Sequence, residues 1–153
     1  MRSWFSWAPL CLTLCVASCA ARDPRLSSAT RAVSLQAFVD GHAIEAGHEI
    51  RADLLDRTTA MSVHVVQVAG GERPHRHVEH DLHVIVMRGK GKMHWRDRAE
   101  DLVAGDSVVV PRGTVHWFVN TGSQPAIAVV TFAPPLDRPD VEPVDVDTPG
   151  ERQ

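Results

Sequence analysis

The sequence predicts an all-β domain, either a sandwich or a barrel. Short apolar or alternating stretches follow one another between residues 50 and 132, and Gly, Pro or Asn residues separate them. Beyond residue 50, little helical periodicity interrupts this series. The chain of 153 residues is long enough for one such domain.

Each element has its own local signal. Ser34 can cap a short helix that runs to Phe38 or Val39 and that Gly41 would end. Valine-rich or alternating stretches then predict strands at 50–58 and 61–69, followed by a loop at 70–74. Further strands are expected at 82–87, 92–96, 98–103, 106–110, 115–119 and 126–132, with a hairpin turn at 88–91.

Three histidines stand where such strands can bring them together. His75 and His77 are two residues apart, so in an extended strand they lie on the same face. His116 begins a later strand, after the turn that starts at Pro111. Neutral imidazole is the commonest metal ligand in proteins. We therefore expect the three side chains to bind one divalent transition metal ion, with Fe, Zn, Ni, Mn and Cu left open.

The spacing around these histidines resembles the two motifs of the cupin superfamily. The second motif, Gly-x5-Pro-x-Gly-x2-His-x3-Asn, is matched by Gly105, Pro111, Gly113, His116 and Asn120. The segment 74–77 and the turn at 88–91 resemble the two ends of the first motif. The resemblance implies a double-stranded β-helix, the cupin barrel, over residues 61–133. It also implies that a small ligand binds at the barrel mouth.

The first cupin motif also contains a glutamate, and here its position is ambiguous. Counting back from Gly89 gives Leu82, whereas counting three residues on from His77 gives Asp81. Asp81 is our hypothesis for a fourth metal ligand; His80, or a site with three histidines alone, are the alternatives. If Leu82 points inward, Val84 and Val86 follow it. Both faces of this strand are mostly apolar, so the pattern does not decide, and a bulge near His80 could bring Asp81 inward.

The resemblance implies a metal-dependent enzyme for a small molecule, either an oxygenase or an isomerase. Three histidines leave positions on the ion where substrate or O2 could coordinate. The alternative is a non-catalytic module that binds a metal or a small ligand. Cupins host many unrelated activities, so the fold does not choose between these. The sequence shows no Gly-x-Ser-x-Gly and no phosphate-binding glycine loop, so hydrolase and kinase functions have no support.

Charge and composition bear on the partners. The formal net charge is −3 and the basic residues form no stripe, so nucleic-acid binding is not expected. Acidic residues and prolines gather in residues 134–153, which we predict to be a disordered tail. An apolar outer face around Trp95 or Trp117 favours a homodimer.

The N-terminal segment resembles the signal peptide of a bacterial lipoprotein. Arg2 precedes an apolar run that is too short to span a bilayer, and small residues lead to Cys19. We expect residues 1–18 to be removed, Cys19 to be lipidated, residues 19–30 to form a tether and residues 31–60 to form a helix and strand extension. No other cysteine follows Cys19, so no thiol would remain. Ala20 favours the outer over the inner membrane, with the protein facing the periplasm of the cell envelope.

Replacing Cys19 by Ser tests this expectation. The variant should be released from membranes or should stay unprocessed, because acyl chains contribute about 0.8 kcal/mol of membrane binding per buried CH2 group. Membrane fractionation and the mass of the N-terminal peptide provide the measurement. Unchanged membrane association and unchanged processing of Cys19→Ser would refute lipidation at this residue.

Overall fold

The computed structural model describes residues 23–28 and 32–146 of the chain. The expected signal peptide and the lipidated Cys19 lie outside the described residues, as do residues 29–31 and 147–153. Within the described part, twelve strands and one helix are found. Ten of these strands form two five-stranded sheets. Within each sheet, every pair of neighbouring strands is antiparallel.

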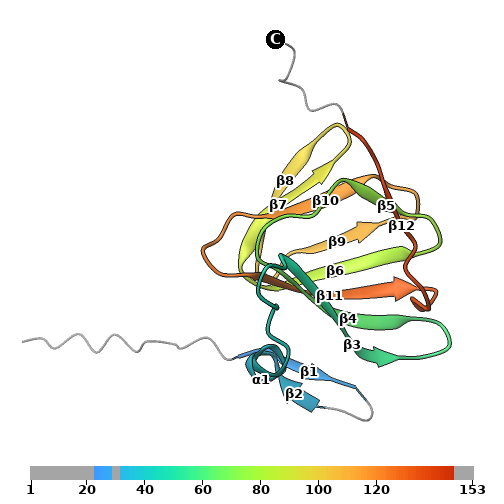
Figure 1. The fold of residues 1–153 in the computed structure, drawn as a ribbon. Coiled ribbons are helices and arrows are strands. Elements are labelled where there is room, and N and C mark those ends of the chain that lie inside the picture. Colours follow the sequence, from blue (N-terminus) through green and yellow to red (C-terminus); the bar gives the residue numbers. More distant parts are fainter. Residues whose placement is uncertain (1–22, 29–31, 147–153) are drawn as a thin grey trace, which may run out of the picture.

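The two sheets form the barrel seen in Figure 1. The first has the order β12 (Val141–Pro143), β5 (His75–His77), β10 (His116–Asn120), β7 (Lys90–Trp95) and β8 (Ala99–Val103). The second has the order β3 (Ile50–Arg57), β4 (Ser62–Val68), β11 (Ala126–Ala133), β6 (Asp81–Arg88) and β9 (Ser107–Val110). The prediction of an all-β, double-stranded β-helix is confirmed. The barrel also includes β3 and β12, which lie outside the predicted 61–133 boundaries.

A small N-terminal layer covers the outer face of the second sheet. It consists of β1 (Arg25–Ser27), β2 (Ala32–Ser34) and α1 (Leu35–Gly41), whose N-cap is Ser34 as predicted. Leu26 and the fully buried Leu35 form a separate core with strand residues such as Val65. Burial of Leu26 explains why part of the expected tether forms a strand instead. In the described segments, no helix has the length and apolarity needed to cross a membrane.

These two cores explain the two apolar faces of β6. Leu82 and Val86 point into the core between the sheets, whereas Met87 packs against the N-terminal layer. A strand buried on both faces lacks a polar side, so alternation could not show its orientation. The structure selects the orientation with Leu82 inward.

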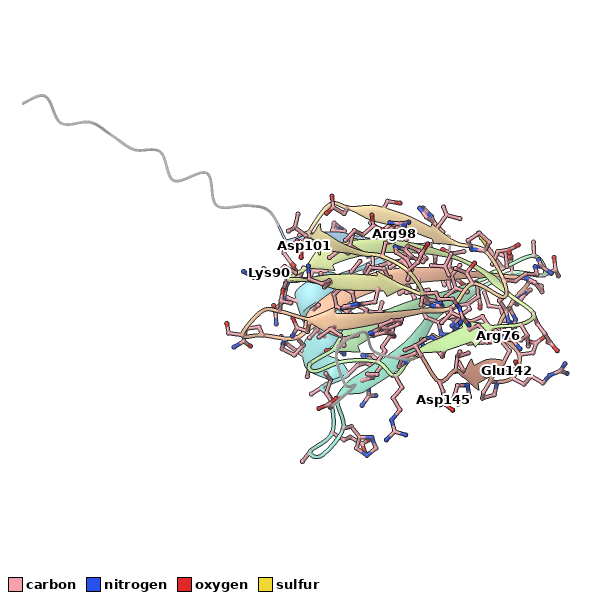
Figure 2. All side chains as sticks on the ribbon, turned by 90° about the horizontal axis from the view of Figure 1, so that it is seen from above. Arg76, Lys90, Arg98, Asp101, Glu142 and Asp145 are labelled. Carbon is pink, nitrogen blue, oxygen red and sulfur yellow. The ribbon has the colours of Figure 1, made fainter. Side chains whose placement is uncertain are left out.

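The segment 134–146, called the C-terminal strap below, is ordered, contrary to the disordered tail expected from its composition. Its strand β12 pairs with β5, opposing Val141 to His77 and Pro143 to His75. Figure 2 shows Arg76 and Glu142 side by side on these strands, and their side chains form an ion pair of 2.7 Å. Composition predicted disorder because the strap has no hydrophobic core of its own. The strap is ordered because it pairs with the edge of an existing sheet.

Strands β7 and β10 approach closely at Gly91. A Cβ atom at this position would overlap the ring of Phe118 and the carbonyl oxygen of Val119. Glycine therefore lets the Phe118 ring lie over β7 between the sheets, where Phe118 is 9% exposed.

Candidate metal centre

Three histidines meet at one end of the space between the sheets. His75 and His116 are direct partners in the antiparallel pairing of β5 with β10, and their ring centroids are 4.5 Å apart. His77 lies two residues further along β5, on the same face, with its ring 5.6 Å from that of His116. One ligand nitrogen from each ring lies within 4.8 Å of the other two. The structure thus brings together the three histidines predicted from the sequence.

Hydrogen bonds fix the proton on each of the three rings. Nδ1 of His75 lies 2.8 Å from the carbonyl oxygen of Arg73, and Nδ1 of His116 lies 2.9 Å from that of Thr114. Nδ1 of His77 lies 2.7 Å from the carboxylate of Asp140. These oxygens only accept, so each Nδ1 donates and the lone pair of each neutral ring is on Nε2. Each ring is therefore already in the tautomer whose Nε2 can coordinate an ion.

Burial keeps two of these rings neutral. Desolvation lowers the pKa of His116 to about 4, more than offsetting the hydrogen bond to Thr114 that favours the charged form. Desolvation also lowers the pKa of His77, although Asp140 opposes this shift. Neutral imidazole is the form that binds a metal, so no proton needs to be displaced near pH 7.

Asp140 of the C-terminal strap is the acceptor for two histidines. Its Oδ1 binds His77 Nδ1, and its Oδ2 binds His80 Nδ1 at 2.6 Å and the backbone N–H of Glu79 at 3.1 Å. The Asp140 side chain is only 1% exposed. Burial alone would raise the pKa of Asp140, but these hydrogen bonds outweigh it and lower the pKa to about 2. His80 therefore contacts Asp140 and is not part of the histidine cluster.

Asp81, our hypothesis for a fourth ligand, lies outside the cluster. Its carboxylate accepts hydrogen bonds from the backbone N–H and the guanidinium of Arg112, at 2.8–3.2 Å. These bonds lower the pKa of Asp81 to about 2, and its side chain is 47% exposed. The pairing of β6 with β11 is regular from Asp81 to Val86, so no bulge turns Asp81 inward. The geometry corresponds to the three-histidine alternative, with Leu82 facing inward.

A cavity of about 500 Å³ adjoins the cluster. Its walls are mainly apolar side chains of both sheets and of the strap, including Val66, Leu82, Val130, Phe132 and Leu136. The three histidines lie in its lining. A small molecule in the cavity would therefore touch an apolar surface over most of its area and the imidazole rings at one end.

Glu72 is a cavity residue that sequence reasoning missed. Its backbone N–H donates to the carbonyl of Phe118 at 2.8 Å, and its Oε2 accepts the Phe118 N–H at 2.8 Å. These bonds fix the side chain against β10, two residues from His116. Burial raises the pKa of Glu72, while the nearby His75 and the Phe118 N–H act in the opposite direction. The available signal was an acidic residue in the loop just before the His-x-His strand.

Comparison with known proteins agrees with this architecture. Residues 62–132 match the cupin domain family. An uncharacterized protein of Aquifex aeolicus is 35% identical over 92 residues, which cover 60% of this chain and 75% of that protein. A solved structure from Klebsiella pneumoniae, described as a conserved protein with a double-stranded β-helix domain, superposes with a TM-score of 0.56. It shares 26% identity and covers 63% of this chain and 86% of its own.

A second relative is similar over part of its length. Acireductone dioxygenase 1 of Nocardia farcinica is 44% identical over 61 residues. The match covers 38% of this chain but only 32% of that protein. The similarity thus concerns one segment of that enzyme.

Acid should destabilise the metal-free protein through His116. The unfolded chain takes up a proton on His116 near its ordinary pKa of 6.5, whereas the folded protein resists it until about pH 4. The unfolded state then binds more protons in this window, so the free energy of unfolding falls as pH decreases from 6.5 to 4. The difference between these two pKa values corresponds to roughly 3 kcal/mol of the free energy of unfolding. Urea unfolding at several pH values measures this slope; an equal slope in His116→Gln would contradict the assignment.

Proposed function

Because the chain belongs to the cupin family, with its cupin domain at residues 62–132, we propose that it is a metal-dependent oxygenase for a small, largely apolar molecule. The observation that carries this proposal is the convergence of His75, His77 and His116 on the wall of an apolar cavity. An isomerase would use the same arrangement, but similarity to a dioxygenase favours the oxygenase.

The donor set fits a divalent transition metal. Three imidazole nitrogens suit Fe, Zn, Ni, Mn or Cu better than Mg or Ca, which prefer oxygen ligands. The tautomers are already the correct ones, since Nδ1 of each ring is hydrogen-bonded and Nε2 keeps its lone pair. An ion bound there would polarise a coordinated substrate oxygen and, if redox-active, would react with O2.

The cavity defines the class of substrate. Apolar side chains from both sheets would hold the body of the molecule, whereas a polar end would face the histidines. A compact molecule with an oxygen-bearing end and a hydrocarbon body fits these requirements. The C-terminal strap contributes Leu136 and Val141 to the lining and would limit the access of water.

Glu72 is the residue we propose to exchange a proton with the substrate. Its Oε2 is fixed by the Phe118 N–H, which leaves Oε1 as the oxygen able to accept a proton from a hydroxyl or an acidic C–H group. Burial raises the pKa of Glu72 toward the range in which a carboxylate is an effective general base. Because Glu72 lines the cavity, its carboxylate can reach a molecule beside the histidines.

A non-catalytic binding module is the second candidate. The nearly continuous apolar lining would also suit a ligand that is carried rather than converted. The two functions differ in their need for Glu72, since binding a ligand without converting it requires the cavity but no proton acceptor.

We further propose that the protein acts at the bacterial cell envelope, because residues 1–19 resemble a lipoprotein signal.

Metal content tests the site directly. Wild-type protein purified without a histidine tag should bind one equivalent of a divalent transition metal, and His116→Ala should lose most of it because one of three ligands is removed. Asp81→Ala is the matched control and should retain the metal, since that carboxylate pairs with Arg112. Elemental analysis with calorimetric titration gives the stoichiometry. Wild-type protein that takes up no metal, or Asp81→Ala that loses it, would refute this site.

The role of Glu72 is tested by turnover at constant metal content. O2 uptake by the metal-loaded protein is screened against catechols and small β-diketones, which combine coordinating oxygens with an apolar body. Glu72→Gln should lower kcat by roughly 100-fold or more, the usual contribution of a general base. The control is Glu79→Gln, an exposed glutamate that pairs with Arg138. Equal turnover of Glu72→Gln and wild type would exclude Glu72, and absence of O2 uptake throughout would favour the binding module.

A further inference from the structure

We propose that Asp140 of the C-terminal strap is a positioning residue of the metal site, acting through His77. This inference rests on the proposed function, because it assumes that His77 is a ligand. The two residues are 63 positions apart in the chain. The residues that would contact a metal lie on β5 and β10, whereas this supporting carboxylate comes from the C-terminal strap.

Both carboxylate oxygens of Asp140 accept hydrogen bonds from buried donors. Oδ1 accepts from His77, and Oδ2 accepts from both His80 and the Glu79 backbone. Both imidazole partners are buried, with side chains 8% and 3% exposed, so water competes little for these bonds. A buried aspartate held by three donors has one orientation. Asp140 therefore fixes both the direction of the His77 ring and the nitrogen that carries its proton.

The Nδ1 hydrogen bonds of the other two ligand histidines do not involve the strap. Nδ1 of His75 and of His116 donates to backbone carbonyls only two residues away. These local bonds form whenever the strands form. Of the three, only His77 is held by a distant side chain, so Asp140 fixes the ring of one ligand and leaves the ring hydrogen bonds of the other two unchanged.

An asparagine at position 140 would disturb this arrangement without changing its shape. Its single carbonyl oxygen can replace only one of the two carboxylate oxygens. Its NH2 group takes the place of the other oxygen and faces groups that donate hydrogen bonds in the wild type. The Glu79 backbone N–H can only donate, so the carbonyl oxygen stays on that side and the NH2 group faces His77, where it favours the tautomer with the lone pair on Nδ1 and the proton on Nε2. That proton would point toward the cluster and would have to be lost before an ion could bind.

Metal affinity provides the first readout, measured on the full chain with Co2+ as the probe. Asp140→Asn should weaken Co2+ binding by roughly 10- to 100-fold, as expected for loss of a carboxylate that supports a ligand histidine. The visible d–d spectrum of the bound Co2+ should also change, because the coordination of one imidazole is altered. Glu142→Gln is the matched control, since it removes the strap's exposed ion pair with Arg76 but leaves Asp140 intact. It should bind Co2+ as wild type does.

The tautomer of His77 provides a second readout that needs no metal. In long-range 1H–15N spectra of the metal-free protein, His77 should carry its proton on Nδ1 in wild type and in Glu142→Gln. In Asp140→Asn it should shift toward the Nε2 form, with the thermal unfolding temperature recorded to show that the variant is folded. Wild-type protein with the predicted tautomer but no Co2+ binding would refute the metal function and leave the positioning by Asp140 standing.

Three results would overturn the proposal. One is a wild-type His77 with its proton on Nε2. Another is a folded Asp140→Asn with wild-type affinity, spectrum and tautomer. The third is an equal loss of affinity in Asp140→Asn and Glu142→Gln, which would show that general ordering of the strap, not the Asp140 carboxylate, matters.

Discussion

The site depends on the register between β5 and β10, which places His75 directly opposite His116. The two-residue repeat of a strand then puts His77 on the same face, so one pairing fixes the origin of all three rings. A shift of one residue would turn His75 and His77 away from the cavity together. Glu72 reinforces this register because its backbone and its carboxylate both bond to Phe118 on β10.

The electrostatics of the site follow from its apolar surroundings. In the low dielectric between two apolar sheets, a charged imidazole is costly, so His77 and His116 remain neutral and able to coordinate. The same surroundings raise the pKa of Glu72, whereas Asp140 stays ionised because buried donors surround it. Two carboxylates close to one cluster are thereby suited to different tasks, one to exchange a proton and one to orient a ring.

Most of the fold and the three histidines could be predicted, because both leave local marks in the sequence. Alternation located the strands, and the spacing of His75, His77 and His116 gave the cluster. The position of Asp81 could not be settled, because β6 packs against apolar cores on both faces and its alternation does not show which side chains point inward. Asp140 left no local signal at all, because its role arises only when the strap pairs with β5.

The close approach at Gly91 has a consequence for selectivity. The Phe118 ring forms part of the cavity wall and occupies the space that a side chain at position 91 would need. The width of the cavity is therefore governed by a residue behind its wall and not by the lining alone. A side chain at position 91 would meet both this ring and the backbone carbonyl of Val119, so it would displace the ring and also separate β7 from β10, the strand that carries His116. Glycine at this position therefore maintains both the size of the cavity and the place of one histidine.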